Sequence, residues 1–308
     1  MWAGAALDAW HALLRDAMRT DGGRSEVRDA PGGSPAPLWP LVHVLWAAAE
    51  VVAIGGAVDV DAVRPSLRKL LRDDGYAATP GGRRFYDDNA WLGLASLRSL
   101  ETTGDEAHRR RAERTTAFVR RGEARGGGVR WAERSPSRNA CSSAAAAWLA
   151  LERGRPDDVA FASRTMEWLG RTLRRPDGLI ADRVIRGKVV RTAWSYNQGA
   201  AIAAWVRLGR DDLVDDLVSS ALGRFRGDRL WHEPPAFATI LFRVLLERPT
   251  GSVLEILDPY LDRLLVEGRD ASGWFTAGGM GSYDGRPTID QAAVVQLLAL
   301  RSQIAAPR

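Results

Sequence analysis

The feature that most constrains the fold is a helical periodicity that recurs along the whole chain of 308 residues. Apolar segments rich in small residues follow one another at a mean interval of about fifty residues. Their centres are Trp46, Trp91, Trp148, Trp205, Phe242 and Val294. A period of this length is typical of one helix pair per repeat, and such repeats must stack to bury their apolar faces. The sequence therefore predicts an all-α fold of roughly six helix pairs.

Charge-faced amphipathic segments alternate with these apolar ones. They are Asp61–Arg72, Asp105–Arg121, Asp157–Arg174, Asp211–Phe225 and Val253–Val266. A buried inner ring and an exposed outer ring of helices would produce this alternation. We therefore expect an (α/α)6 barrel, with residues 1–308 forming a single domain. An open helical solenoid shares the alternation and is the competing architecture.

Glycine and proline clusters mark the expected turns. They include Thr79–Gly82, Gly126–Gly128 and Gly278–Gly285. Only Thr20–Pro37 is long and polar enough to predict a mobile loop, and no linker divides the chain. The first helix is expected over Met1–Met18, where apolar residues follow helical spacing.

Composition excludes several classes of function. The formal charge of +5 comes almost entirely from arginines interleaved with acidic residues, so we expect no nucleic-acid partner. The most apolar stretch, Leu41–Val60, is interrupted by charged residues, so no membrane span is predicted. The amino terminus lacks the pattern of a signal peptide, which predicts a cytoplasmic protein, or a secreted one if a leader was removed.

Metal and disulfide chemistry find no support in the residue pattern. Cys141 is the single cysteine, which excludes an internal disulfide framework and a cysteine-based zinc cage. The four histidines have no metal-ligand spacing. We therefore expect no metal and no cofactor.

Two adjacent carboxylates, Asp87 and Asp88, form the most informative motif. They stand among Tyr86, Asn89 and Trp91, just before an apolar segment. One interpretation is helix capping, because aspartate and asparagine are favoured in the first turn. The other is an acid and nucleophile pair, because neighbouring carboxylates can divide into an ionised and a protonated group. A retaining glycosidase requires such a pair at about 5 to 5.5 Å. The residue chemistry leaves both interpretations open.

A second polar cluster precedes another apolar segment. It comprises Trp194, Tyr196, Asn197 and Gln198, whose uncharged donors and acceptors suit sugar hydroxyls. The alternative is that these side chains satisfy loop backbone. Asn139 and Asp182 occupy similar places before or between apolar segments, and loops at one end of successive inner helices are expected to converge.

The twelve tryptophans divide by context. Those within apolar helices, such as Trp10 and Trp205, are predicted to lie in the core. Those in turns can either stack on a sugar ring or pack in the interior; they are Trp131, Trp194, Trp231 and Trp274.

Taken in order, these motifs resemble glycoside hydrolase family 76, the endo-α-1,6-mannanases. The similar segments are 86–92, 127–131, 138–140, 177–182 and 194–199. The resemblance implies an (α/α)6 barrel and a retaining double displacement, with Asp87 as nucleophile and Asp88 as general acid/base. It also implies a carbohydrate substrate, α-mannan or a manno-oligosaccharide, and no metal. The residues expected to bind that substrate are Tyr86, Asn89, Trp131, Asn139, Asp182, Trp194, Tyr196, Asn197 and Gln198.

The chain departs from the family pattern at two lysines. Ala238 stands where the family has lysine within its Phe-Lys-Gly segment, and Arg138 replaces the lysine before Asn139. Two other functions remain alternatives: a non-catalytic glycan-binding module, and an enzyme like the sugar epimerases or uronyl hydrolases on the same fold. We expect the protein to be a monomer.

Overall fold

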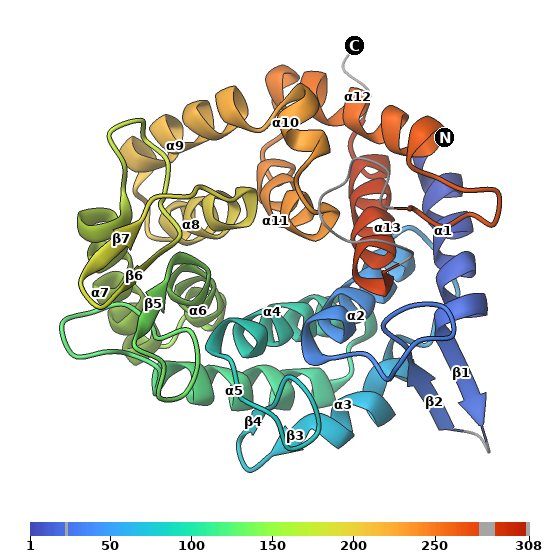
Figure 1. The fold of residues 1–308 in the computed structure, drawn as a ribbon, viewed down its shortest axis with the longest axis horizontal. Coiled ribbons are helices and arrows are strands. Elements are labelled where there is room, and N and C mark those ends of the chain that lie inside the picture. The colour runs from blue at the N-terminus through green and yellow to red at the C-terminus, as the bar shows by residue number, and fades with distance from the viewer. Residues whose placement is uncertain (22–23, 277–286, 306–308) are drawn as a thin grey trace.

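A closed ring of parallel helices forms the centre of the computed structural model, which describes residues 1–21, 24–276 and 287–305 (Figure 1). Each inner helix contacts the next, and the last contacts the first, so the ring is continuous. In chain order these helices are α2 (Leu38–Ala53), α4 (Tyr86–Thr103), α6 (Ala140–Arg153), α8 (Ser195–Arg207), α11 (Pro235–Leu245) and α13 (Thr288–Ser302).

A second ring of helices surrounds the first (Figure 1). Its members are α1 (Trp2–Ala17), α3 (Arg64–Leu70), α5 (Glu106–Arg120), α7 (Pro156–Leu173), α9 (Asp211–Arg224) and α12 (Gly251–Glu267). Helix α1 packs on α13, so the first helix of the chain covers the last one and completes the outer layer. The predicted (α/α)6 barrel is confirmed and the open solenoid is excluded, because helices from the first and last repeats are in contact.

Small residues explain how the inner helices approach one another. The run Ala144–Ala147 in α6 has no exposed surface. On α8, a Cβ added to Gly199 would lie 2.6 Å from the carbonyl oxygen of Ile240 on α11, so the two backbones are in contact there. Left-handed glycines, Gly104 and Gly154, end α4 and α6 and allow the chain to turn immediately into the outer helix.

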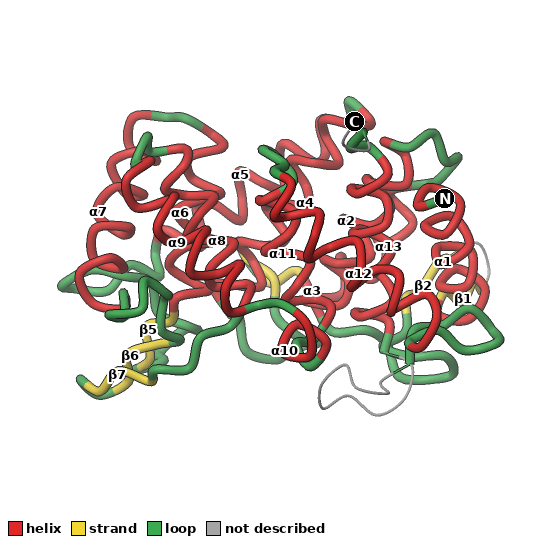
Figure 2. The backbone as a smooth tube through the Cα atoms, turned by 90° about the horizontal axis from the view of Figure 1, so that it is seen from above, coloured by secondary structure: helices red, strands yellow, loops and turns green. Residues whose placement is uncertain are grey.

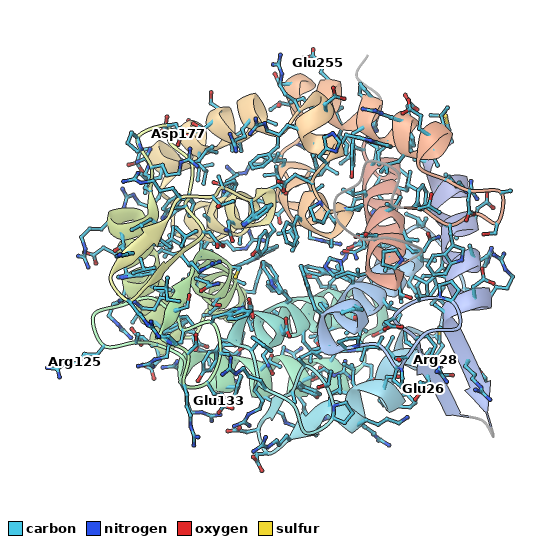
Figure 3. All side chains as sticks on the ribbon, in the orientation of Figure 1. Glu26, Arg28, Arg125, Glu133, Asp177 and Glu255 are labelled. Atoms are coloured by element: carbon cyan, nitrogen blue, oxygen red, sulfur yellow. The ribbon has the colours of Figure 1, made fainter. Side chains whose placement is uncertain are left out.

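Many charged residues lie on the outside of this arrangement. The charged side chains labelled in Figure 3, among them Glu26, Arg125 and Glu255, are placed around the edge of the ring. The core tryptophans predicted from helical context, including Trp10 and Trp205, are each 2% exposed. Within the described residues, no helix is both long and apolar enough to cross a membrane.

The longer connections carry short strands and two short helices. The strands are β1 (Met18–Asp21), β2 (Arg24–Val27), β3 (Leu71–Arg72), β4 (Gly75–Tyr76), β5 (Ser137–Asn139), β6 (Arg183–Ile185) and β7 (Lys188–Val190). The short helices are η1 (Val60–Val63) and α10 (Gly227–Trp231). Figure 2 places β5–β7 and α10 at one end of the barrel. The predicted mobile loop over 20–37 is wrong in part, because residues 20–21 and 24–27 belong to β1 and β2, which pair in antiparallel orientation. The turn predicted over 278–285 lies outside the described residues.

A repeated side-chain clamp fixes these connections to the inner ring. The fourth residue of an inner helix bonds the backbone of the preceding loop: Asn89 bonds Tyr76, and Gln198 bonds Ile180. Gln291 bonds Phe275 and Gly273 in the same way, and Ser143 accepts from Val129 N–H. Buried backbone groups need such partners, so the loops are held at the N-terminal ends of the inner helices.

Candidate active site

The two adjacent aspartates lie in the first turn of α4, where the helix enters the ring. Asp87 is 8% exposed, and Asp88 is partly buried. The N-cap residue is Phe85, so neither aspartate caps the helix as an N-cap. Asp87 Oδ1 accepts the backbone N–H of Asp88 at 3.0 Å, and the positive end of the helix favours a negative charge at this position. The first turn therefore supports the ionised form of Asp87.

The two carboxyl groups differ in their surroundings. Burial raises the pKa of Asp87 to about 6, although hydrogen bonds from the Cys141 thiol and the Asp88 N–H oppose the rise. Burial and the negative charge of Asp87 raise the pKa of Asp88 well above its ordinary value, with no donor among the described residues to oppose them. Asp87 is therefore the more readily ionised carboxyl of the pair.

The side chain that contacts Asp87 most directly was not predicted as a site residue. The thiol of Cys141, the second residue of α6, donates to Asp87 Oδ2 at 3.1 Å. Tyr196, the second residue of α8, hydrogen-bonds to the same thiol. In the sequence a single cysteine indicates only the absence of disulfides. Its placement 54 residues from Asp87 became informative only once α4 and α6 were known to be neighbours.

Asp182, on the loop before β6, lies beside the cluster formed by Asp87, Cys141 and Tyr196. Asp182 is 4% exposed and forms an ion pair with Arg183. Burial raises the pKa of Asp182, while Arg183 and the amide of Asn197 act to lower it. Asn139 ends β5 and accepts a hydrogen bond from Ser137 Oγ at 2.5 Å. The β5–β6 pairing joins Asn139 to Arg183, so the sheet brings these residues to one place.

Aromatic side chains border the cluster. Trp131 is 39% exposed, and its ring centroid lies 4.8 Å from that of Phe85. A hydrogen bond from its indole acts to lower the pKa of Asp87. Tyr196 stacks on Phe237 at 4.1 Å, and Trp194 meets Phe237 edge to face. Trp131 and Trp194 keep the exposed or half-buried faces that sugar stacking requires.

The aromatic cluster also crosses the ring axis. Trp39, the second residue of α2, lies 6.4 Å from Tyr196 and 5.6 Å from Phe237. Helix α2 is separated from α8 by two inner helices in either direction around the ring. Trp39 was missed because it appears in the sequence as one more apolar residue of a buried helix.

Three residues expected to bind substrate have structural positions instead. Tyr86 is 6% exposed and stacks on Phe118 between the two rings. Asn89 and Gln198 have no exposed surface, and their amides are engaged by backbone groups in the clamps described above. These predictions are corrected: the amides of Asn89 and Gln198 hold loop backbone and are not free for a ligand, and the Tyr86 ring packs against α5.

Two of the four turn tryptophans are also core residues. Trp274 is completely buried, with its indole donating to Asp16 at 2.6 Å, and Trp231 is 5% exposed against Tyr260. Ala238, at the site of the missing family lysine, has no exposed surface within α11. A lysine there would have to extend out of a packed position.

One set of potential metal ligands was not visible in the sequence spacing. Asp61, Asp105 and His108 place ligand atoms within 4.8 Å of one another, away from the Asp87 cluster. Arg64 forms ion pairs with both aspartates, so its guanidinium already supplies the positive charge. Burial lowers the pKa of His108 to about 4, with Arg111 adding to the effect.

The fold and the cluster together define a class of protein. Paired carboxylates with separated pKa values, beside aromatic rings and neutral amides, are the equipment of enzymes that cleave glycosidic bonds. Here they stand at the loop end of an (α/α)6 barrel.

Sequence comparison agrees with this class. Residues 67–209 match the family model of glycosyl hydrolase family 76, so the family recognised from the motifs is confirmed on this segment. None of the curated proteins compared with the chain matches it.

Solved structures share the fold along nearly the whole chain. An α-1,6-mannanase of this family from Salegentibacter sp. HEL1_6 is 20% identical, with a TM-score of 0.81, covering 98% of this chain and 99% of that one. A family 76 α-mannanase from Bacteroides thetaiotaomicron is 17% identical, with a TM-score of 0.84, covering 98% and 96%. A heparin-specific unsaturated glucuronyl hydrolase is 13% identical, with a TM-score of 0.71, covering 98% and 97%.

Proposed function

We propose that this protein is a retaining α-glycoside hydrolase that cleaves α-1,6-linked mannose in mannan or manno-oligosaccharides. The observation that carries the proposal is the unequal environment of two adjacent carboxyls, Asp87 and Asp88. A retaining hydrolase needs one ionised carboxylate and one protonated carboxyl at the same bond. The donors around Asp87 and their absence around Asp88, within the described residues, support Asp87 as the nucleophile and Asp88 as the general acid.

In the first step, the ionised Asp87 attacks the anomeric carbon while Asp88 gives its proton to the departing glycosidic oxygen. The C–O bond to the leaving sugar breaks as the bond to Asp87 forms. In the second step, Asp88, now ionised, takes a proton from water, and that water displaces Asp87 from the sugar. The configuration at the anomeric carbon is retained, and both carboxyls return to their starting states.

The surrounding residues suit a neutral sugar. Trp131 offers an exposed indole face beside the Asp87 carboxylate, and Trp194 and Tyr196 stand on the next loop and helix. Aromatic faces bind the apolar faces of pyranose rings, and amides and carboxylates serve the hydroxyls. Asn139 and Asp182 supply such groups from the β5–β6 pairing.

The related structures support the choice of linkage. The Salegentibacter mannanase has been solved as an inactive variant with two consecutive aspartates replaced by alanine, in complex with α-1,6-mannotetrose. A corresponding asparagine variant holds α-1,6-mannotriose. In this chain, Asp87 and Asp88 are consecutive aspartates at the start of an inner helix of the same fold.

The test is release of reducing sugar from α-1,6-mannan and from short α-1,6-manno-oligosaccharides. Wild type, Asp87→Asn and Asp88→Asn are compared, with calorimetric binding of α-1,6-mannotetraose to each. We expect turnover only in wild type and binding in all three. Binding without wild-type turnover would instead favour a glycan-binding module. Turnover only on unsaturated uronyl substrates would favour the uronyl hydrolase alternative.

A further inference from the structure

Three consecutive inner helices present a polar side chain at their second position. These residues are Asp87 on α4, Cys141 on α6 and Tyr196 on α8. Because the helices are neighbours in the ring and begin at the same end, the three side chains meet. Their hydrogen bonds form a chain: the Tyr196 hydroxyl bonds the thiol, and the thiol donates to Asp87 Oδ2 at 3.1 Å.

We propose that Cys141 is a positioning residue for Asp87, with a thiol that fixes the carboxylate and favours its ionised form without blocking its attack. This inference rests on the proposed hydrolase function. The Asp88 N–H holds Oδ1 at 3.0 Å and the thiol holds Oδ2, so both oxygens of Asp87 are located. A carboxylate held at both oxygens cannot rotate freely about its terminal bond, which keeps it in a productive geometry.

The weak donor strength of a thiol determines how Cys141 affects the Asp87 carboxylate. A thiol is a weak hydrogen-bond donor compared with a hydroxyl. It therefore stabilises the carboxylate less and leaves it more basic and more nucleophilic than a serine would. Cys141 is 1% exposed, and its own pKa is raised well above the ordinary value by burial and by the Asp87 charge, so it stays a protonated donor.

The other charged and titratable groups around Asp87 mostly oppose its ionisation. Asp88 on α4 and Asp182 on the loop before β6 are both acids, and Tyr196 on α8 is a neutral phenol with a raised pKa. The Trp131 indole acts in the same direction as the thiol. Without Cys141, the donors left to Asp87 are the backbone N–H groups of Asp87 and Asp88 and that indole, so we expect the pKa of Asp87 to rise.

The first test uses Cys141→Ala and Cys141→Ser and measures kcat/KM for an α-1,6-manno-oligosaccharide from pH 4 to pH 9. Alanine removes the donor, and we expect the acid limb to move up by about one pH unit, a roughly tenfold loss below pH 5.5. Serine keeps a donor, and its acid limb is expected at or below that of wild type. Acid limbs that coincide in all three proteins would overturn the proposal and leave the thiol a packing role.

Ser143→Ala is the matched control, because it removes a buried hydroxyl from the same helix. Ser143 bonds Val129 N–H at 2.9 Å and makes no bond to Asp87. We expect it to lower the melting temperature with the acid limb unchanged. A limb shifted equally by Ser143→Ala would mean that loosening α6, not losing the thiol donor, causes the effect, and would also overturn the proposal.

A second measurement is independent of turnover. The carboxyl carbon of Asp87, labelled with carbon-13 and assigned with Asp87→Asn, is titrated by NMR in wild type and in Cys141→Ala. A higher titration midpoint in the alanine variant supports the role of the thiol even if wild type cleaves no mannoside, in which case only the proposed function fails. Equal midpoints overturn the role of Cys141 whatever the activity.

Discussion

A buried ionic network at the other end of the barrel allows a quantitative test of the structure. Glu50 on α2 has no exposed surface and pairs with Arg243 at 2.6 Å and with Arg98 at 2.8 Å. Arg98 also pairs with Glu101 at 3.1 Å, and that carboxylate is 64% exposed. The two glutamates therefore share a partner but differ completely in burial, so Glu50→Gln and Glu101→Gln form a matched pair.

The expected magnitudes follow from burial. Glu50→Gln leaves the guanidinium of Arg243, which is 7% exposed, without its counter-charge. Breaking a buried pair in this way costs about 3–5 kcal/mol of unfolding free energy. The exposed pair of Glu101 contributes about 0–1 kcal/mol. For 308 residues the entropy of unfolding is about 0.65 kcal/mol per kelvin, so a loss of about 4 kcal/mol lowers the melting temperature by about 6 °C.

The assay is urea unfolding followed by far-UV circular dichroism at pH 7, with thermal melting as a second measure. Burial raises the pKa of Glu50, but Arg243 and Arg98 outweigh it and hold the pKa below its usual value. A carboxyl with a lowered pKa stabilises the fold above its unfolded pKa, and that contribution is lost as the pH falls through the folded pKa. The difference between wild type and Glu50→Gln should therefore shrink below pH 4. Equal, small losses for both variants at pH 7 would refute the reasoning.

Three further outcomes are expected. Asp88→Ala should slow oligosaccharide cleavage far more than cleavage of activated aryl α-mannosides, because an acidic leaving group needs no proton; equal losses in a kinetic comparison would contradict its role as acid. Gly199→Ala should lower the free energy of unfolding by about 1–3 kcal/mol, because the added Cβ would lie 2.6 Å from the backbone of Ile240. Gly223→Ala, at an open position in α9, should instead raise it by about 0.5–1 kcal/mol, and urea unfolding measures both. Asp87→Asn should raise the melting temperature at pH 8 but not at pH 4. The pKa of Asp87 in the folded state is raised to about 6, so its protonated carboxyl stabilises the fold below the unfolded pKa. This contribution is lost as the pH rises through 6. Unchanged melting temperatures at both pH values would contradict the prediction.

The fold followed from the sequence because its signals are local. Apolar residues at helical spacing predicted the inner helices, and charged faces at the same spacing predicted the outer ones. The main misjudged segment was the hairpin of β1 and β2. Its strands are short and charged, and no alternation of apolar residues marks them.

The candidate site was only partly visible. Asp87 and Asp88 stood out because the adjacent carboxylates stand among aromatic residues just before an apolar segment. The side-chain amides of Asn89 and Gln198 have the same donors and acceptors as an amide that binds sugar. Only their hydrogen bonds to loop backbone in the structure show that they hold the loops in place. Cys141 gave no signal, since its partner lies on another helix.

The sequence by itself determined the helices, their alternation and the position along each helix at which polar residues occur. These depend on spacing within a few turns, which the chain encodes directly. Only the tertiary structure decided which polar side chains turn toward one another at the start of the inner ring and which are used to hold loops. That choice depends on how each helix is rotated and seated against its neighbours. Packing of Gly199 against α11 and closure of the inner ring by α2 and α13 set this rotation, and both join residues far apart in the chain.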